Sequence, residues 1–338
     1  MKERGISMTG VKILGVGKYV PELTVTNEMM SEIVETNDEW ITTRTGIKSR
    51  HITNGEPTYH LGAMAAKEAV EDSGINPGDI GLIIVTTITN DFSTPSAACL
   101  IQREIGAVGS MAIDINCACS GFVYAFDMAK RYLQTDDNLK YVLVVSAEEL
   151  SKITDYTDRS TCVLFGDGAA AVVLKRNEDT IFSEYLGADG TGAEFLSARS
   201  YISETPFTTN HDKFDDKMPD SNGHFLYQNG KEVYKFATKT LPLAVSSACQ
   251  KIGITPDDLD LIIPHQANVR IIETAAKNLN IPMDKFYLNL NKHGNTSSAS
   301  IPLALYDAVK DGRLKRGDKA CIVGFGAGLT YGGVVFEY

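Results

Sequence analysis

The sequence predicts an α/β protein of two similar halves, because one pattern of helix, turn and strand occurs in it twice. The segment GINPGDIGLII at 74–84 returns 179 residues later as GITPDDLDLII at 253–263, and seven of the eleven positions are identical. An Ala-rich helical pattern precedes each copy. Each copy ends in a continuous apolar run, which is typical of a strand buried on both faces.

Two further pairs of segments extend this repeat along the chain. They are KYVLVVS at 140–146 with KACIVGF at 319–325, and MAIDIN at 111–116 with FYLNLN at 286–291. Three echoes in one order indicate a duplication better than they indicate chance. We therefore predict two α/β halves, 1–180 and 181–338, which pack about a pseudo-twofold axis.

The start of the chain and one internal segment lack this pattern. MKERGISMTG at 1–10 has no apolar stretch after its charges, so it is interpreted as a polar leader in which Met1 or Met8 is the start. The polar segment 197–224 is predicted to form a surface excursion over the second half. No run of about eighteen apolar residues occurs, so a membrane-spanning helix is not expected.

Composition narrows the class of partner. Hydrophobic residues make up 43% of the 338 positions, charged residues make up 22%, and the formal net charge is −11. This acidic balance argues against a nucleic-acid or membrane-surface binder, so an acidic partner would need a local basic patch. The six cysteines are scattered, which favours reduced thiols in a cytoplasmic protein, and the six histidines lack metal-ligand spacing. We predict no metal and no tightly bound cofactor.

The first candidate for chemistry is Cys119, in DINCACSGF at 114–122. A strand ends here and a helical pattern, FVYAFDMAKRYL, begins. Unpaired backbone N–H groups and the positive end of the helix dipole favour a thiolate at such a position. The alternative is a small cysteine buried in a core turn. Cys117 is the weaker candidate because it lies earlier in the turn.

Two residues of the second half fall at related strand ends. His265 follows the apolar strand of the second repeat in IIPHQANVR, and Asn295 precedes a Thr/Ser-rich helix start in NKHGNTSSAS. A lone histidine after a strand is usually a loop residue with satisfied hydrogen bonds. Three reactive groups at related strand ends of a duplicated fold indicate a site.

These elements carry a resemblance to a known family. ACSGF with Cys119, PHQAN with His265 and HGNTSSAS with Asn295 resemble the Cys-His-Asn triad of the β-ketoacyl-acyl-carrier-protein synthase III family. Three more motifs match in order: DEWITTRTGI at 38–47, TDRSTCVLFGDGAAA at 157–171 and GFGAGLTYGG at 324–333. The resemblance spans Val11 to Tyr338. It implies a thiolase-like fold, with two duplicated α/β halves in a layered α-β-α-β-α arrangement.

The resemblance also implies an activity and its residues. Cys119 would take an acyl group from acyl-CoA as a thioester. Malonyl-acyl-carrier protein would then lose CO2, and His265 and Asn295 would hold the resulting enolate oxygen. The backbone N–H groups of Cys119 and Ala327 would form a second oxyanion hole. Acyl-CoA is a substrate in this scheme, and no cofactor is implied.

The family's binding contacts are carried over by position. CoA contacts are expected from Thr36, Trp40, Arg44, Arg159 and Asn268, with Trp40 and Arg159 on either side of the adenine. Arg270 matches the main docking residue for the acidic carrier protein. The remaining docking positions are Gln266, Ala267, Asn268, Val269, Lys235 and Lys277.

The loop TITNDFSTPSAAC departs from members that accept only acetyl primers. In the family this loop crosses a homodimer interface to the partner's acyl pocket, and acetyl-restricted members can carry phenylalanine at the position of Thr94. A smaller threonine predicts tolerance of longer primers, unless Phe92 fills the space. The alternative is that Thr94 only packs the interface.

Other signals are set aside or remain as alternatives. GVGKYV at 15–20 and GFGAGL at 324–329 fail as nucleotide-binding motifs, and no GxSxG surrounds Ser120. A degradative thiolase would need a second reactive cysteine before the last glycine turn, whereas Cys321 is predicted to be strand core. A ketosynthase of secondary metabolism with another acyl-CoA primer remains possible, as does a non-catalytic carrier-binding scaffold.

Overall fold

The structure is a computed structural model that describes residues 10–178, 180–200, 206, 218–219 and 224–338. The predicted polar leader, with its choice between Met1 and Met8, therefore lies almost wholly outside the described residues. So does most of the predicted surface excursion at 197–224.

The first half of the chain builds a five-stranded sheet. Its order is β1 (Gly10–Tyr19), β7 (Gly168–Asn177), β6 (Tyr141–Glu148), β4 (Ile80–Thr86) and β5 (Met111–Ile115). Strand β4 is parallel to both β5 and β6, and β7 is antiparallel to β1 and β6. The apolar runs of the first repeat thus become central strands that are covered on both faces.

The second half repeats this sheet with one strand fewer. The order β8 (Phe182–Ala188), β13 (Thr330–Glu337), β12 (Lys319–Gly326) and β11 (Leu261–Pro264) matches β1-β7-β6-β4. The counterpart of β5 is reduced to one bridge between Ile262 and Phe286, with a 2.9 Å hydrogen bond from the Tyr287 N–H to the Ile262 carbonyl. The segment FYLNLN therefore forms a bridge where its counterpart MAIDIN forms a strand.

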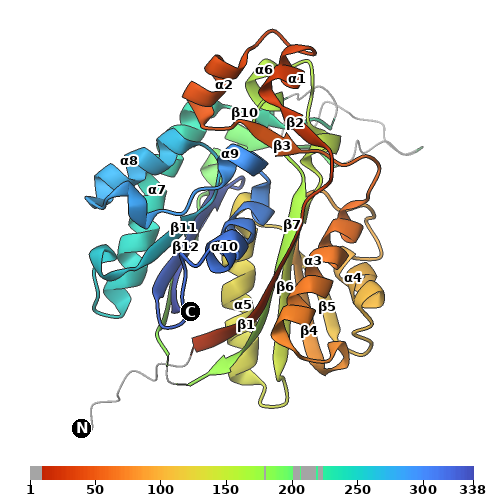
Figure 1. The fold of residues 1–338 in the computed structure, drawn as a ribbon, viewed down its shortest axis with the longest axis vertical. Coiled ribbons are helices and arrows are strands. Elements are labelled where there is room, and N and C mark those ends of the chain that lie inside the picture. The colour runs from red at the N-terminus through yellow and green to blue at the C-terminus, as the bar shows by residue number, and fades with distance from the viewer. Residues whose placement is uncertain (1–9, 179, 201–205, 207–217, 220–223) are drawn as a thin grey trace.

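The helices complete five layers, which confirms the predicted α-β-α-β-α arrangement (Figure 1). Helices α3 (Thr58–Ser73) and α4 (Ala97–Ile105) cover the outer face of the first sheet, and α7 (Gly230–Lys251) and α8 (Val269–Leu279) cover that of the second. Between the sheets lie α5 (Gly121–Thr135) and α10 (Ser300–Lys310).

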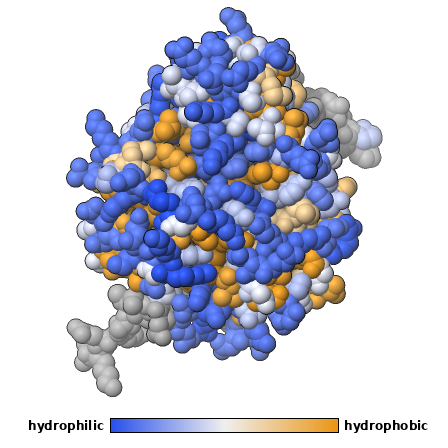
Figure 2. Space-filling view, viewed as in Figure 1, coloured by the Kyte–Doolittle hydropathy of each residue, from blue (hydrophilic) through white to orange (hydrophobic). Residues whose placement is uncertain are grey.

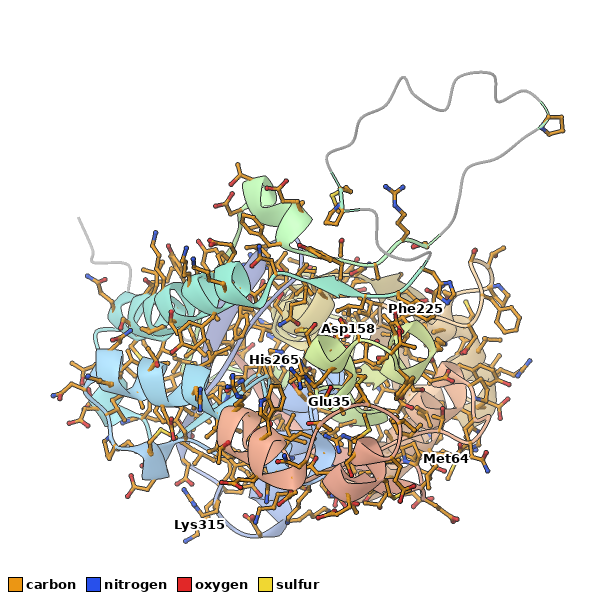
Figure 3. All side chains as sticks on the ribbon, turned by 90° about the horizontal axis from the view of Figure 1, so that it is seen from above. Glu35, Met64, Asp158, Phe225, His265 and Lys315 are labelled. Atoms are coloured by element: carbon orange, nitrogen blue, oxygen red, sulfur yellow. The ribbon has the colours of Figure 1, made fainter. Side chains whose placement is uncertain are left out.

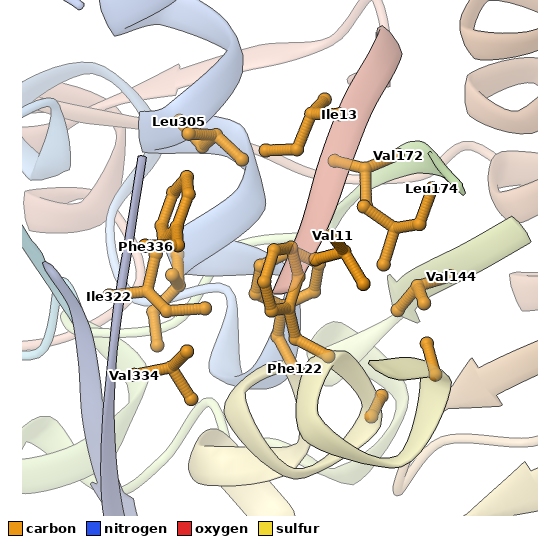
Figure 4. Close-up of a cluster of buried hydrophobic side chains, with 14 of the residues drawn as sticks. Val11, Ile13, Phe122, Val144, Val172, Leu174, Leu305, Ile322, Val334 and Phe336 are labelled. Carbon is orange, nitrogen blue, oxygen red and sulfur yellow. The ribbon is translucent and has the colours of Figure 1, made fainter. Parts of the chain in front are cut away.

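The largest core cluster lies between the two sheets and joins both halves (Figure 4). Phe122 and Phe126 of α5 pack on each other, and Phe126 packs on Phe336 of β13 with ring centroids 5.2 Å apart. Each such side chain contributes about 1.5–3 kcal/mol when fully buried. Because α5 and α10 are anchored in one core, their N-terminal ends are held in fixed relation to each other.

The repeated segment has the same structure in both halves. In the first, α3 ends at Ser73, Gly74 has a φ of 70°, and a 3-10 turn leads into β4. In the second, α7 ends at Lys251, Gly253 has a φ of 72°, and a 3-10 turn leads into β11. We retain the division near residue 180 as a proposal, and it is supported by the separate strands of the two sheets.

Short elements form a cap at one end of the layers. They are α1 (Asn27–Ser31), α2 (Asp38–Thr45), α6 (Arg159–Cys162), α9 (Leu290–His293), β2 (Thr24–Thr26), β3 (Ser49–His51), β9 (Leu196–Ser197) and β10 (Tyr227–Gln228). The 3-10 turns are η1 (Pro77–Asp79), η2 (Ala118–Ser120), η3 (Leu150–Ile153), η4 (Gly190–Phe195), η6 (Pro256–Asp258), η7 (Met283–Lys285) and η8 (Ser297–Ala299). Buried Arg50 ties the cap together, since its guanidinium donates to Asn27 Oδ1 at 3.0 Å and to the Val163 carbonyl at 2.7 Å.

The visible surface is mainly hydrophilic, with scattered apolar groups (Figure 2). Among the described helices, none combines the length and the hydrophobicity needed to traverse a bilayer.

Candidate active site

Cys119 lies in the 3-10 turn η2, between the end of β5 and the start of α5. Ala118 has a φ of 45°, and its N–H donates to Asn116 Oδ1 at 3.2 Å. Gly121 begins α5 in contact with Thr86, and a Cβ there would collide with the Thr86 hydroxyl. This close approach places the thiol at the junction of the two sheets.

The Cys119 thiol is buried and donates to Ser297 Oγ at 3.4 Å. Burial raises its pKa to about 12, and the nearby Glu148 charge adds to this effect, whereas the Ser297 hydroxyl acts in the opposite direction. The lowering of the thiol pKa that the helix start predicts is therefore not found, because desolvation outweighs it.

His265 follows β11 and lies inside the molecule (Figure 3). Its N–H continues the parallel ladder to the Val323 carbonyl at 2.8 Å, and its ring packs edge-on against Phe325 with centroids 5.3 Å apart. Ring Nδ1 lies 2.6 Å from Ser300 Oγ. Burial lowers the pKa of His265 to about 3, so the imidazole is neutral at physiological pH.

Asn295 precedes η8 and is held on both sides of its backbone. Its N–H donates to the Leu164 carbonyl at 2.8 Å, and its carbonyl accepts from the Gly166 N–H at 3.0 Å. Its side-chain Oδ1 accepts from the Ser297 N–H at 2.9 Å. With Oδ1 engaged, the amide NH2 group is the part of the side chain left to donate into the site.

The turns around Cys119 and Asn295 are related by the duplication. Asn116 lies 179 residues before Asn295, and each asparagine Oδ1 accepts from the N–H two residues further on. Those following residues, Ala118 and Ser297, both have a left-handed φ, of 45° and 48°. One repeated turn thus supplies the nucleophile in the first half and the amide in the second.

One large cavity, of about 1450 Å³, brings the three predicted residues together. Cys119, His265 and Asn295 all line it, as do Gly326 and Ala327 of the turn after β12. A Cβ at Gly326 would lie 2.6 Å from the Cys119 nitrogen, so this strand runs directly beside the nucleophile. Ala327 is thus placed near the Cys119 backbone, where the second oxyanion hole is expected.

Three of the five expected CoA contacts line this cavity. They are Trp40, Arg44 and Asn268, and the Asn268 amide donates to the Arg44 carbonyl at 3.0 Å. The Arg159 guanidinium lies 5.0 Å from the Trp40 ring centroid, which leaves no room for a base between them. Arg159 would have to move to admit adenine. Thr36 is not part of the cavity wall, and its buried hydroxyl has no hydrogen-bond partner among the described residues.

The expected docking positions divide into exposed and buried ones. Arg270, Lys235 and Lys277 are exposed, and the first two lie at the wall of the cavity. The Arg270 guanidinium donates to the Thr43 carbonyl at 2.9 Å, and Lys235 pairs with Glu232. Gln266 is a correction: its buried side chain donates to the Pro264 and Tyr287 carbonyls, so it does not face a partner. Ala267, Asn268 and Val269 are half-buried.

Thr94 is exposed and is not among the residues that line this chain's own cavity. Phe92 and Ser93, on the same loop, do line it. Cys321 is fully buried in β12, which confirms the prediction that it is a core residue.

Sequence reasoning missed three polar side chains next to the reactive groups. Ser297 contacts the Cys119 thiol, Ser300 contacts the His265 ring, and buried Glu148 ends β6 behind them. The signal for Ser297 was present, because it lies 179 residues after Ala118 in the repeated turn. No group of histidine, cysteine or acidic side chains suited to hold a metal ion occurs in the described part of the chain.

Comparisons with known proteins agree with this geometry. A family model described as 3-oxoacyl-[acyl-carrier-protein] synthase III matches residues 113–190, and the model of its C-terminal part matches residues 249–338. Cys119 falls in the first match, and His265 and Asn295 fall in the second.

Full-length relatives extend these matches over nearly the whole chain. A β-ketoacyl-[acyl-carrier-protein] synthase III of Clostridium acetobutylicum is 49% identical over 98% of this chain and 99% of its own length. A crystal structure of 3-oxoacyl-[acyl-carrier-protein] synthase III from Aquifex aeolicus has a TM-score of 0.89 at 42% identity, over 97% of this chain and 100% of that one. A priming β-ketosynthase of the R1128 polyketide pathway has a TM-score of 0.85 at 33% identity, over 100% and 99%.

Proposed function

The chain belongs to the β-ketoacyl-acyl-carrier-protein synthase III family, and from this premise we propose how its residues perform the reaction. The protein is an acyltransferase of the condensing type. It joins an acyl-CoA primer to malonyl-acyl-carrier protein with loss of CO2, which gives 3-oxoacyl-acyl-carrier protein and initiates fatty acid synthesis.

In the first half-reaction, the Cys119 sulfur attacks the thioester carbonyl of acyl-CoA and CoA leaves. The product is an acyl group bound to Cys119 as a new thioester. The carbonyl oxygen gains negative charge on the way. The backbone N–H groups of Cys119 and Ala327 stabilise it, and the approach of Gly326 to the Cys119 nitrogen supports this assignment.

In the second half-reaction, malonyl-acyl-carrier protein loses CO2 and becomes an enolate. His265 Nε2 and the Asn295 amide donate hydrogen bonds to the enolate oxygen. Such a donor is typically worth ~3–4 kcal/mol in the transition state. The neutral state of His265 suits this role, because a neutral imidazole can donate from Nε2 without adding a charge.

The carriers of the two substrates approach the mouth of the cavity. Trp40, Arg44 and Asn268 contact CoA, with Arg159 and Thr36 beside them, and Arg270 with Lys235 and Lys277 meets the acidic carrier protein. We include the half-buried stretch Ala267–Val269 in this docking surface and leave out Gln266. The protein acts in the cytoplasm as a homodimer, without metal or cofactor.

One observation carries the proposal: a cysteine of the first half and a histidine and an asparagine of the second line the same cavity. The R1128 priming ketosynthase is the less similar relative, at 33% identity against 49%, so a primer for fatty acid synthesis is favoured over one for a secondary metabolite.

The experiment measures CO2 release from malonyl-carrier protein, with and without acyl-CoA. Mass spectrometry of the enzyme after incubation with acyl-CoA accompanies it. Condensation coupled to an acyl adduct on Cys119 supports the proposal, whereas CO2 release without any adduct would contradict it. A carrier-binding scaffold would show neither.

A further inference from the structure

The proposed function leaves one buried acid without a role. Glu148 ends β6 and is fully buried behind the nucleophile. The hydrogen bonds that its carboxyl makes with described residues come from hydroxyl groups and one backbone N–H. Burying a carboxyl without a cationic partner is costly, so its presence calls for an explanation.

The two oxygens of this carboxyl have different surroundings. Oε2 accepts from the Ile88 N–H at 3.1 Å, from Thr89 Oγ1 at 2.7 Å and from Thr87 Oγ1 at 3.3 Å. Thr89 Oγ1 itself accepts from the Glu149 N–H, so its proton points to Oε2. With three donors around it, Oε2 is always an acceptor. A proton taken up by Glu148 must therefore sit on Oε1.

Oε1 has a partner that suits both protonation states. Ser298 Oγ lies 2.6 Å from Oε1 and 3.2 Å from the Thr86 carbonyl. When Glu148 is ionised, the Ser298 hydroxyl donates to Oε1. When Oε1 is protonated, it donates to Ser298, whose own hydrogen turns to the Thr86 carbonyl. Neither state leaves a buried polar group unpaired.

Ser297 connects this acid to the nucleophile. The Cys119 thiol donates to Ser297 Oγ at 3.4 Å, and the Ser297 side chain also hydrogen-bonds to the Glu148 carboxyl. A path of two hydrogen bonds thus runs from the thiol to the acid.

We propose that Glu148 takes up the thiol proton of Cys119 through Ser297 when the acyl group is transferred, an inference that rests on the proposed function. The proton moves from Sγ to Ser297 Oγ while the Ser297 proton moves to Glu148 Oε1. The sulfur then attacks the acyl-CoA carbonyl, the C–S bond to CoA breaks, and the CoA thiolate takes a proton from water.

The stored proton is used in the second half-reaction. When the enolate attacks the acyl group, the Cys119 thiolate leaves and recovers the proton from Glu148 by the same path. Each cycle therefore consumes one proton from water and returns Glu148 to its ionised form. The site also carries a single buried anion at a time, first the carboxylate and then the enolate.

Electrostatics are consistent with one shared proton. Burial raises the pKa of Glu148 above its usual value, and the Glu148 charge contributes to the raised pKa of Cys119. The two groups therefore resist being ionised together. The nearest other charges, those of Glu149, Lys152 and Asp91, pair with one another, with Lys152 Nζ 3.0 Å from Glu149 and 3.1 Å from Asp91.

Two variants interrupt the path without changing its shape. Glu148→Gln matches the neutral acid, because its oxygen can accept the three donors and its amide can donate to Ser298. Ser297→Ala removes the linking hydroxyl, and the φ of 45° at Ala118 shows that alanine fits this turn. Glu149→Gln is the control, since Glu149 contacts Thr53, Thr58 and Lys152 instead of the nucleophile.

The test measures two rates from pH 5.5 to 9.5: acylation of Cys119 by acyl-CoA in a single turnover, and its alkylation by iodoacetamide. In the wild type and in Glu149→Gln, acylation should be level at neutral pH and fall as the acid is protonated. In Glu148→Gln and Ser297→Ala it should fall ~100-fold at pH 7 and rise in proportion to hydroxide.

Three outcomes separate the possibilities. Wild-type rates and profiles in both variants would overturn the inference. An equal loss at every pH would also overturn it, because that is the effect of a structural role. If the wild type takes up no acyl group, the proposed function fails, and the iodoacetamide profile still decides whether Glu148 draws the proton from Cys119.

Discussion

Ser300 Oγ lies 2.6 Å from His265 Nδ1, and the same oxygen accepts from the Gln266 N–H at 3.3 Å. Since the backbone N–H can only donate, the Ser300 hydroxyl hydrogen is free to point at Nδ1. Nδ1 then accepts, and the single ring proton of the neutral imidazole sits on Nε2. Ser300 at the start of α10 thus selects the tautomer that can donate into the cavity.

Ser300→Ala should weaken decarboxylation of malonyl-carrier protein by about tenfold, because Nε2 would carry the proton for only part of the time. Acylation of Cys119 should be unchanged. The decarboxylation rate of the wild type should show no step near pH 6.5, since His265 stays neutral far below its usual pKa. Equal losses in both half-reactions would mean that Ser300 merely supports the fold.

Cys119→Ser should abolish condensation, whereas Cys117→Ser should keep most of it. Both thiols line the cavity, but only Cys119 lies at the helix start beside Gly326. Mass spectrometry after incubation with acyl-CoA should place the adduct on Cys119. An adduct on Cys117 would overturn the assignment of the nucleophile.

The duplication was predictable because each half needs the same buried strands, and apolar runs bounded by Gly and Pro survive in both copies. The loss of the fifth strand was not predictable, because FYLNLN keeps the alternation of MAIDIN while making only the bridge at Phe286. A strand depends on its neighbour as well as on its own residues.

The site was predictable in its reactive groups but not in its electrostatics. The position of Cys119 at a helix start indicates a lowered thiol pKa, yet burial raises it, and the degree of burial is set by contacts from both halves. Ser297 and Glu148 come from segments 149 residues apart. Their meeting at Cys119 follows from the packing of η8 against β6, which no local pattern encodes.

His265→Ala and Asn295→Ala should each lose decarboxylation far more than acylation, by roughly 10²–10³-fold, which is the usual effect of removing one oxyanion donor. CO2 release and formation of the acyl adduct are measured separately on each variant. Decarboxylation at the wild-type rate in either variant would show that its proposed role is wrong.

Arg270→Glu should raise the Michaelis constant for malonyl-carrier protein and reduce its dependence on salt, while acyl transfer from CoA to Cys119 survives. Charge pairs at the rim of an interface act mainly on the association rate and its salt dependence. Lys140→Glu makes the same charge change at an exposed residue before β6 and serves as the control. A Michaelis constant that moves equally in both variants would point to overall charge instead of docking.

Thr94→Phe should shorten the range of acyl-CoA primers that the enzyme accepts. Thr94 is exposed in the single chain and is absent from the wall of its own cavity, as expected for a residue that reaches the acyl pocket of a partner. Each primer methylene that the pocket buries contributes about 0.8 kcal/mol, so a bulky ring should exclude the longer chains first. Primers from acetyl- to octanoyl-CoA are compared in both proteins, with Phe92→Ala to test whether that neighbouring ring fills the space. If the wild type accepts only acetyl-CoA, or if Thr94→Phe leaves the preference unchanged, Thr94 does not control primer length.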